Sequence, residues 1–227
     1  MTLRVSVSRY DAPIVTLFGP IGTGKTSLMQ RWERVERASP ADRRCVWIDA
    51  TSQVAGFARE GGDGIVFVDD VHKADTPAAL LTLDSLIQSI RLPSQLVIAG
   101  RYDPGLALGR RRADADVVDL DETDLQLDRG AILAAAEQLG SQIDESAANR
   151  IRASTEGWPL AVVETIRRCA DTGHPDDNEF DRATDLVADR VGSEFAGSTD
   201  VRSIDVLTRC AFLDVGTVEA AEFVNGD

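Results

Sequence analysis

The amino-acid sequence predicts an α/β fold with a mainly parallel sheet flanked by helices. Short apolar, β-branched runs alternate with stretches of helical periodicity through about residue 120. The runs lack polar and apolar alternation, as expected of parallel strands that are buried on both faces. After residue 120 the pattern is helical only, which indicates a further, all-α region.

The expected strands are short apolar runs that end in an acidic residue or are followed directly by glycine or an acidic residue. They are Ile14–Phe18, Cys45–Asp49, Gly64–Asp69, Gln95–Ala99 and Val117–Leu120. The helices expected between them are one from about Lys25 to Arg37, a short one before the third strand, and one that begins after Asp75-Thr76-Pro77. Pro77 suits the first turn of that last helix, and Pro93 ends it.

The helical region begins with a cap at Asp128 and a helix through Leu139, closed by Gly140. Further helices are expected at residues 144–155, 158–170, 180–195 and 201–212, with a polar linker at 171–179. The predicted domains are therefore an α/β domain at 1–122, a small helical domain at 123–172, and a linker with the start of a further helical domain at 173–227.

Composition limits the classes of function. The chain has 227 residues and a formal net charge of −14, from 24 Lys and Arg against 38 Asp and Glu. A polyphosphate backbone would be repelled by such a surface, so we expect no direct nucleic-acid binding. The basic run Arg110–Arg112 is interpreted as a solvated or salt-bridged helix face.

The cysteines and histidines indicate reduced thiols and no structural zinc site. Cys45, Cys169 and Cys210 are scattered, as expected of thiols in a cytoplasmic protein, and the sequence has no zinc-ligand spacing. No apolar run approaches the roughly 20 residues of a membrane helix. We therefore expect a cytoplasmic protein without a membrane partner.

A glycine-rich stretch carries the strongest chemical signal. GPIGTGKTSL follows the first expected strand and precedes a helix, and it matches the phosphate-binding pattern G-x-x-x-x-G-K-[ST] of P-loop (Walker A) nucleotide-binding proteins. Its backbone N–H groups would surround phosphates, Lys25 would reach the terminal phosphates, and Thr26 would bind Mg²⁺. The alternative is a plain turn. The residues predicted to bind nucleotide here are Gly19, Pro20, Ile21, Gly22, Thr23, Gly24, Lys25, Thr26 and Ser27.

Two acids follow the third expected strand, as in a Walker B site. Asp69 would hold Mg²⁺, and Asp70 would orient or activate the attacking water. Arg101 follows the fourth strand, where a guanidinium could stabilise charge on the γ-phosphate. The predicted catalytic residues are thus Asp70, Lys25 and Arg101, and the metal ligands are Thr26 and Asp69. Solvent-facing turn acids and a surface arginine are the alternatives, and His72 is either a phosphate-relay residue or a loop histidine.

Between two expected helices lies the corner Glu156–Ala161, whose sequence is EGWPLA. Taken alone it predicts a helix-turn-helix corner with a buried Trp158, and Pro159 suits the first turn of the second helix.

Together, GPIGTGKTSL, IVFVDDVH, LVIAGRYDP and EGWPLA resemble, in order, the STAND class of P-loop ATPases. The resemblance spans residues 12–170 and is greatest to maltose-regulator-like and large ATP-binding LuxR-type transcription regulators. It implies an ATP/ADP switch in signal transduction, a lid in which Pro159 contacts or covers the adenine, and self-association or a protein partner in the ATP state. It also implies that residues 206–214 begin a winged-helix-like segment. Arg9 is the candidate for the base-contacting arginine of the family.

Three functions follow from these features. The preferred one is a regulatory switch with slow, Mg²⁺-dependent ATP hydrolysis, hence a weak ATPase. A non-hydrolysing nucleotide-binding interaction module is the alternative. A small-molecule kinase is disfavoured by the paired acids and by the lack of an arginine-rich acceptor lid.

Overall fold

The computed structural model describes residues 12–39, 43–50 and 64–172. All of them belong to the first of the two units into which the chain divides, residues 1–176. Several expectations lie outside the described residues: Arg9, the short helix between the second and third strands, the helices at 180–195 and 201–212, and the winged-helix-like segment.

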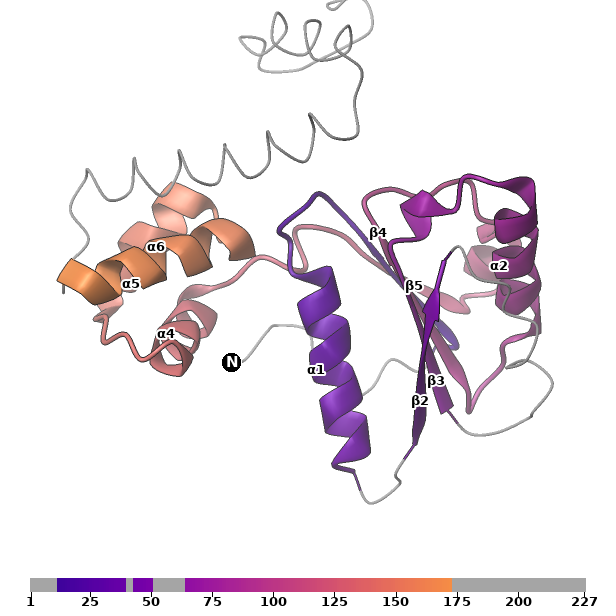
Figure 1. The fold of residues 1–227 in the computed structure, drawn as a ribbon, viewed down its shortest axis with the longest axis horizontal. Helices are drawn as coiled ribbons and strands as arrows, with labels where there is room; N and C mark the ends of the chain where they lie inside the picture. The colour runs from indigo at the N-terminus through magenta and orange to yellow at the C-terminus, as the bar shows by residue number, and fades with distance from the viewer. Residues whose placement is uncertain (1–11, 40–42, 51–63, 173–227) are drawn as a thin grey trace, which may run out of the picture. The chain divides into compact units, whose positions relative to one another are not determined.

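Five parallel strands form one sheet in the order β2-β3-β4-β1-β5 (Figure 1). The predicted parallel sheet is confirmed. Each strand lies within one residue of its expected bounds. β1 pairs with both β4 and β5, so the loop after it follows an inner strand of the sheet. The strands are β1 Ile14–Phe18, β2 Arg44–Asp49, β3 Gly64–Asp69, β4 Gln95–Gly100 and β5 Val117–Leu120.

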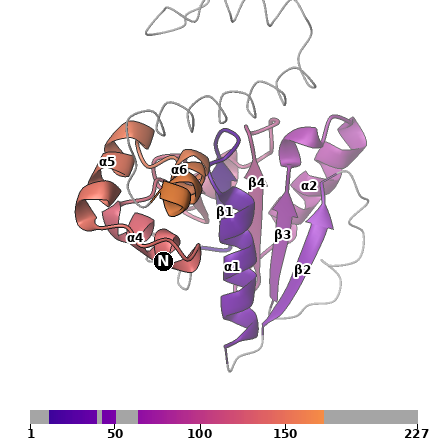
Figure 2. The same ribbon diagram turned by 60° about the vertical axis from the view of Figure 1, so that its left-hand side comes forward.

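Alternate residues of the strands supply two hydrophobic cores, one on each face of the sheet. On one face, Val15 and Leu17 pack with Trp32 of α1, the helix Lys25–Arg37. On the other face, strand residues pack with Leu83 and Ile87 of α2, the helix Pro77–Ser89. Figures 1 and 2 show α1 and α2 on opposite faces of the sheet.

Two short elements were not expected from the sequence. The 3-10 helix η2, Val71–Lys73, follows β3 directly, and α3, Gly109–Ala113, precedes β5. In α3, Arg111 is buried, donates to Ile90 O at 2.7 Å and pairs with Asp116 at 2.8 Å. The arginine run is therefore a salt-bridged structural element and only partly a solvated face.

Three helices follow the sheet as expected and lie together in Figure 2. Asp128 and Asp144 cap the first two, each accepting a hydrogen bond from a backbone N–H of the first turn. Ala131, Ile132, Ala148, Ile151, Val162 and Ile166 are buried and form their apolar sides. The helices are α4 Arg129–Gln138, α5 Glu145–Thr155 and α6 Pro159–Thr172.

Candidate functional site

The glycine-rich loop between β1 and α1 is wound tightly around the ammonium group of Lys25. Lys25 Nζ donates to the carbonyl oxygens of Gly19 and Pro20, both at 2.7 Å, and lies 3.1 Å from Thr23 Oγ1. Gly22 and Gly24 have φ values of 80° and 84°, a conformation that glycine adopts without strain. Burial lowers the pKa of Lys25, while the carboxylates of Asp69 and Asp70 oppose this shift.

Thr26 and Asp69 meet at the carboxyl end of β3. Thr26 Oγ1 donates to Asp69 Oδ2 at 2.6 Å, and Asp69 Oδ1 accepts from the backbone N–H of Asp70 at 2.8 Å. Hydroxyl and carboxylate oxygens are the ligands that Mg²⁺ prefers. In the part of the chain that the structure describes, no group of three or more His, Cys, Asp or Glu side chains could hold a metal ion by itself. The hydroxyl of Thr26 and the carboxylate of Asp69 therefore fit two of the ligand positions of a Mg²⁺ ion.

Asp70 lies directly beyond this pair, in a left-handed conformation with φ 55°. Its carboxylate accepts a hydrogen bond from Lys73 Nζ at 2.6 Å, and His72 Nδ1 lies 4.0 Å from its other oxygen. His72 Nδ1 also accepts from the backbone N–H of Arg101 at 3.3 Å. His72 thus links the turn after β3 to the end of β4.

The predicted catalytic residues therefore share one edge of the sheet. They follow β1, β3 and β4, which are parallel and therefore end at the same edge. Burial lowers the pKa of Lys25, the charges of Asp69 and Asp70 raise it, and the charge of Arg101 lowers it. One backbone N–H group that the sequence assigns to phosphate binding has a protein partner in this structure. Gly19 N donates to Gly100 O at 3.3 Å, which closes the loop onto β4.

His72 provides a pH-dependence that can be measured. Burial lowers the pKa of its imidazole, Asp70 raises it, and Arg101, Lys73 and Lys25 lower it further. Because the folded pKa lies below the ordinary value of about 6.5, the unfolded chain binds more protons between these two values. This contribution to stability is complete above pH 6.5 and is lost as the pH falls through the folded pKa.

The variant His72→Asn keeps a neutral hydrogen-bond acceptor but cannot be protonated. We expect wild type to lose stability relative to His72→Asn as the pH is lowered from about 7 to 5, as measured by urea unfolding. The other histidine, His174, is present in both proteins and cancels. If the difference in unfolding free energy between the two proteins did not change with pH, folding would not lower the pKa of His72.

The corner between α5 and α6 docks directly on the glycine-rich loop. Trp158 Nε1 donates to Ile21 O at 3.2 Å, and Leu160 N donates to Gly22 O at 3.0 Å. A Cβ atom on Gly22 would lie only 2.7 Å from Leu160 Cβ, so glycine is required for this contact. Pro159 lies over Gly24, 3.7 Å from where a Cβ would be. None of these contacts could be read from the sequence.

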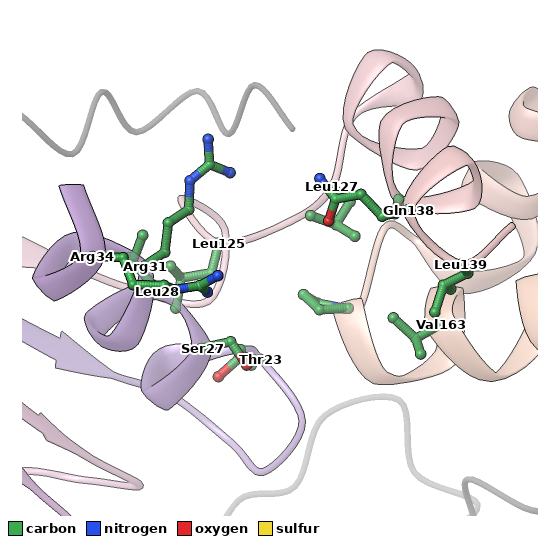
Figure 3. Close-up of a pocket in the computed structure, with 13 residues that line it drawn as sticks. Thr23, Ser27, Leu28, Arg31, Arg34, Leu125, Leu127, Gln138, Leu139 and Val163 are labelled. Carbon is green, nitrogen blue, oxygen red and sulfur yellow. The ribbon is translucent and has the colours of Figure 1, made fainter. Parts of the chain in front are cut away.

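A cavity of about 370 Å³ opens beside this contact. Figure 3 shows its two walls: Thr23, Ser27, Leu28, Arg31 and Arg34 belong to the loop and α1, and Leu127, Gln138, Leu139 and Val163 belong to the helical region. Gly24, Leu125, Ala135 and Pro159 complete the lining. Four of the lining residues were predicted as nucleotide-binding residues, although the sequence did not indicate the cavity itself: Thr23, Gly24, Ser27 and Pro159.

Comparisons with known proteins extend the fold assignment. No family model and no curated protein matches the chain. Among solved structures, the Walker-type ATPase PABY2304 of Pyrococcus abyssi is similar with a TM-score of 0.63 at 12% identity, covering 95% of this chain and 79% of that one. The chain has the P-loop NTPase fold.

Two further structures share this P-loop NTPase fold. The P216G mutant of Thermotoga maritima RuvB has a TM-score of 0.56 at 19% identity, covering 93% of this chain and 74% of that one. Domain III of the Thermotoga maritima replication initiation protein DnaA has a TM-score of 0.51 at 17% identity, covering 80% and 85%. The STAND subclass stays a prediction.

In the described segments, no helix is both long and apolar enough to cross a membrane.

Proposed function

We propose that this chain binds ATP and ADP with Mg²⁺ and works as a regulatory switch with slow ATP hydrolysis. The observation that carries the proposal is the docking of the Trp158–Leu160 corner on the glycine-rich loop, through bonds of 3.2 and 3.0 Å. A loop that contacts phosphates on one side and the helical region on the other can transmit the state of the nucleotide to that region.

Each predicted site residue has a role in this proposal. The loop N–H groups and Lys25 would hold the phosphates, and Thr26 and Asp69 would hold Mg²⁺, which neutralises phosphate charge when bound. Arg101 would stabilise charge on the γ-phosphate. Pro159, over Gly24, would cover the nucleotide from the helical region. The cavity beside Ser27 would take the base.

The surroundings of Asp70 support slow hydrolysis. A general base needs a free carboxylate aimed at water, but Lys73 Nζ donates to Asp70 at 2.6 Å. The salt bridge is exposed, with more than half of each side chain accessible, so it is weak and can break. Hydrolysis is therefore slowed, because Asp70 is free to act as a base for only part of the time. This favours a switch over a fast enzyme.

The solved neighbours support the nucleotide part of the proposal. One is a Walker-type ATPase of Pyrococcus abyssi, and DnaA of Aquifex aeolicus, with a TM-score of 0.50 at 13% identity, was solved with AMPPCP bound. The proposal also includes what the STAND resemblance implies: self-association or a protein partner in the ATP state, a cytoplasmic location, a lid at 123–172, and a further domain beginning after 172. DNA binding by this chain itself is not proposed.

The experiment is to identify nucleotide that co-purifies with the chain, then to follow ATP hydrolysis with and without Mg²⁺. Retained ADP and slow, Mg²⁺-dependent turnover support the switch. Absence of both bound nucleotide and nucleotide binding on addition would exclude the proposal.

The variant Asp70→Asn separates the switch from a non-hydrolysing binding module. We expect hydrolysis to fall about 100-fold, the usual contribution of a general base, with ATP affinity changed by less than about 3-fold. Glu122→Gln, which removes one exposed acid near the loop, is the matched control and should keep full turnover. Equal rates for wild type and Asp70→Asn would exclude Asp70 as the base and favour the module.

A further inference from the structure

The cavity begins at the glycine-rich loop and extends along one side of α1. Thr26 faces the metal end, where it donates to Asp69. Ser27, the next residue, lines the cavity together with Arg31 and Arg34. These three residues are spaced i, i+4 and i+7, so they follow one side of α1 away from the phosphates. A nucleotide with its phosphates in the loop would place its base along this side.

Arg31 and Arg34 differ from Arg37, the arginine one turn further along α1, in their charge partners. Arg37, on the same helix, pairs with Glu33 at 2.8 Å. Within the described residues, by contrast, neither Arg31 nor Arg34 has a carboxylate partner, and the one hydrogen bond of Arg34 goes to its own helix, at Gln30 O. Two guanidinium groups that have no acid partner among the residues the structure describes therefore line a cavity in a protein with a net charge of −14.

The opposite wall supplies complementary groups. Leu127, Leu139 and Val163 provide apolar contact, and Gln138 provides an amide that can both donate and accept hydrogen bonds. A planar guanidinium stacks on aromatic rings and donates to ring nitrogen and carbonyl acceptors. A purine offers a large aromatic face and acceptors at several edges, so this combination suits a purine base.

We infer that Arg31, assisted by Arg34, binds the purine base of the nucleotide, across the cavity from Gln138. This inference rests on the proposed function and adds the residues that set its base selectivity. Arg31 is the half-buried member of the pair and makes the larger contribution, whereas Arg34 is exposed. Because the two walls come from α1 and from the helical region, the base contacts both.

The test compares two probes, ATP and inorganic tripolyphosphate, in titration calorimetry with Mg²⁺. The probes share the phosphate chain, but only ATP has a base. For Arg31→Ala we expect ATP affinity to fall about 10-fold while tripolyphosphate affinity changes by less than about 2-fold. Arg31→Lys keeps the charge without the planar group, so it should recover only part of the loss. The matched control Arg37→Ala should leave both affinities unchanged.

Selectivity provides a second readout. Wild type should bind ATP more tightly than UTP. Arg31→Ala should reduce that preference, because the guanidinium stacks on a larger area of a purine than of a pyrimidine. Equal losses of ATP and tripolyphosphate affinity in Arg31→Ala would overturn the inference, because the arginine would then act only through its charge. Unchanged ATP affinity would also overturn it. If wild type bound neither probe, the proposed function itself would fail, which is a distinct result.

Discussion

Replacing Gly157 with alanine is expected to lower the free energy of unfolding by about 3–4 kcal/mol, the largest stability effect we anticipate for a single methyl group in this chain. Gly157 has φ 78°, and a Cβ there would lie 2.6 Å from the backbone oxygen of Leu127. Leu127 cannot withdraw without loss, because its own N–H donates to Gly157 O at 2.8 Å. Urea unfolding of the full chain measures the effect.

Gly140→Ala is the matched control for this substitution. Gly140 also has a positive φ, 72°, and ends a helix of the same region, but nothing lies within 4 Å of the position of its Cβ. It should therefore show only the backbone cost of about 1 kcal/mol. Equal destabilisation by the two substitutions would mean that the corner relaxes freely and that its fit to Leu127 is not required.

Replacing Lys25 with alanine is expected to weaken ATP binding by about 30- to 150-fold, which corresponds to about 2–3 kcal/mol for a lost hydrogen bond to a charged group. The ammonium lies 2.7 Å from two loop carbonyl oxygens, so it is already held where the loop would surround phosphates. Titration of the purified variant with ATP and Mg²⁺ checks this. Because the side chain is partly buried, a melting curve should accompany the titration to confirm folding.

Lys73→Ala is the control for charge alone, since Lys25 and Lys73 are the two lysines in the sequence. Lys73 is exposed and pairs with Asp70. Its removal also lowers the net positive charge near the site, but it should leave ATP affinity within about 3-fold. A loss as large as that of Lys25→Ala would indicate attraction by net charge in place of a specific phosphate contact.

The helices and strands, and the residues at their ends, could be predicted from the sequence. Local signals defined β1 and α1, because a buried parallel strand has a continuous apolar run and the glycine-rich loop separates it from helical periodicity. The same holds for Asp128 and Asp144, whose capping side chains act within one turn. Placing Asp69 and Arg101 at one sheet edge required only the rule that parallel strands end together.

Contacts between segments that are distant along the chain could not be predicted from the sequence. The bond between His72 and Arg101 joins two loops, and nothing in the local pattern of either loop encodes it. The salt-bridged alternative for the arginine run holds for Arg111, but its burial and its bond to Ile90 O, just after α2, could not be predicted from the local sequence. The cavity depends on how α1 faces the helical region, which is a property of tertiary packing.

The docking of Trp158 and Leu160 on the loop has a kinetic consequence. The carbonyl groups of Ile21 and Gly22 belong to the segment that would surround the phosphates, so a bound nucleotide and the corner would share the same short piece of backbone. Release of product would then require the two hydrogen bonds from Trp158 and Leu160 to break. A force or a partner acting on α6 would lengthen or shorten the lifetime of the bound state. Residence time, more than equilibrium affinity, would be the quantity that such a chain regulates.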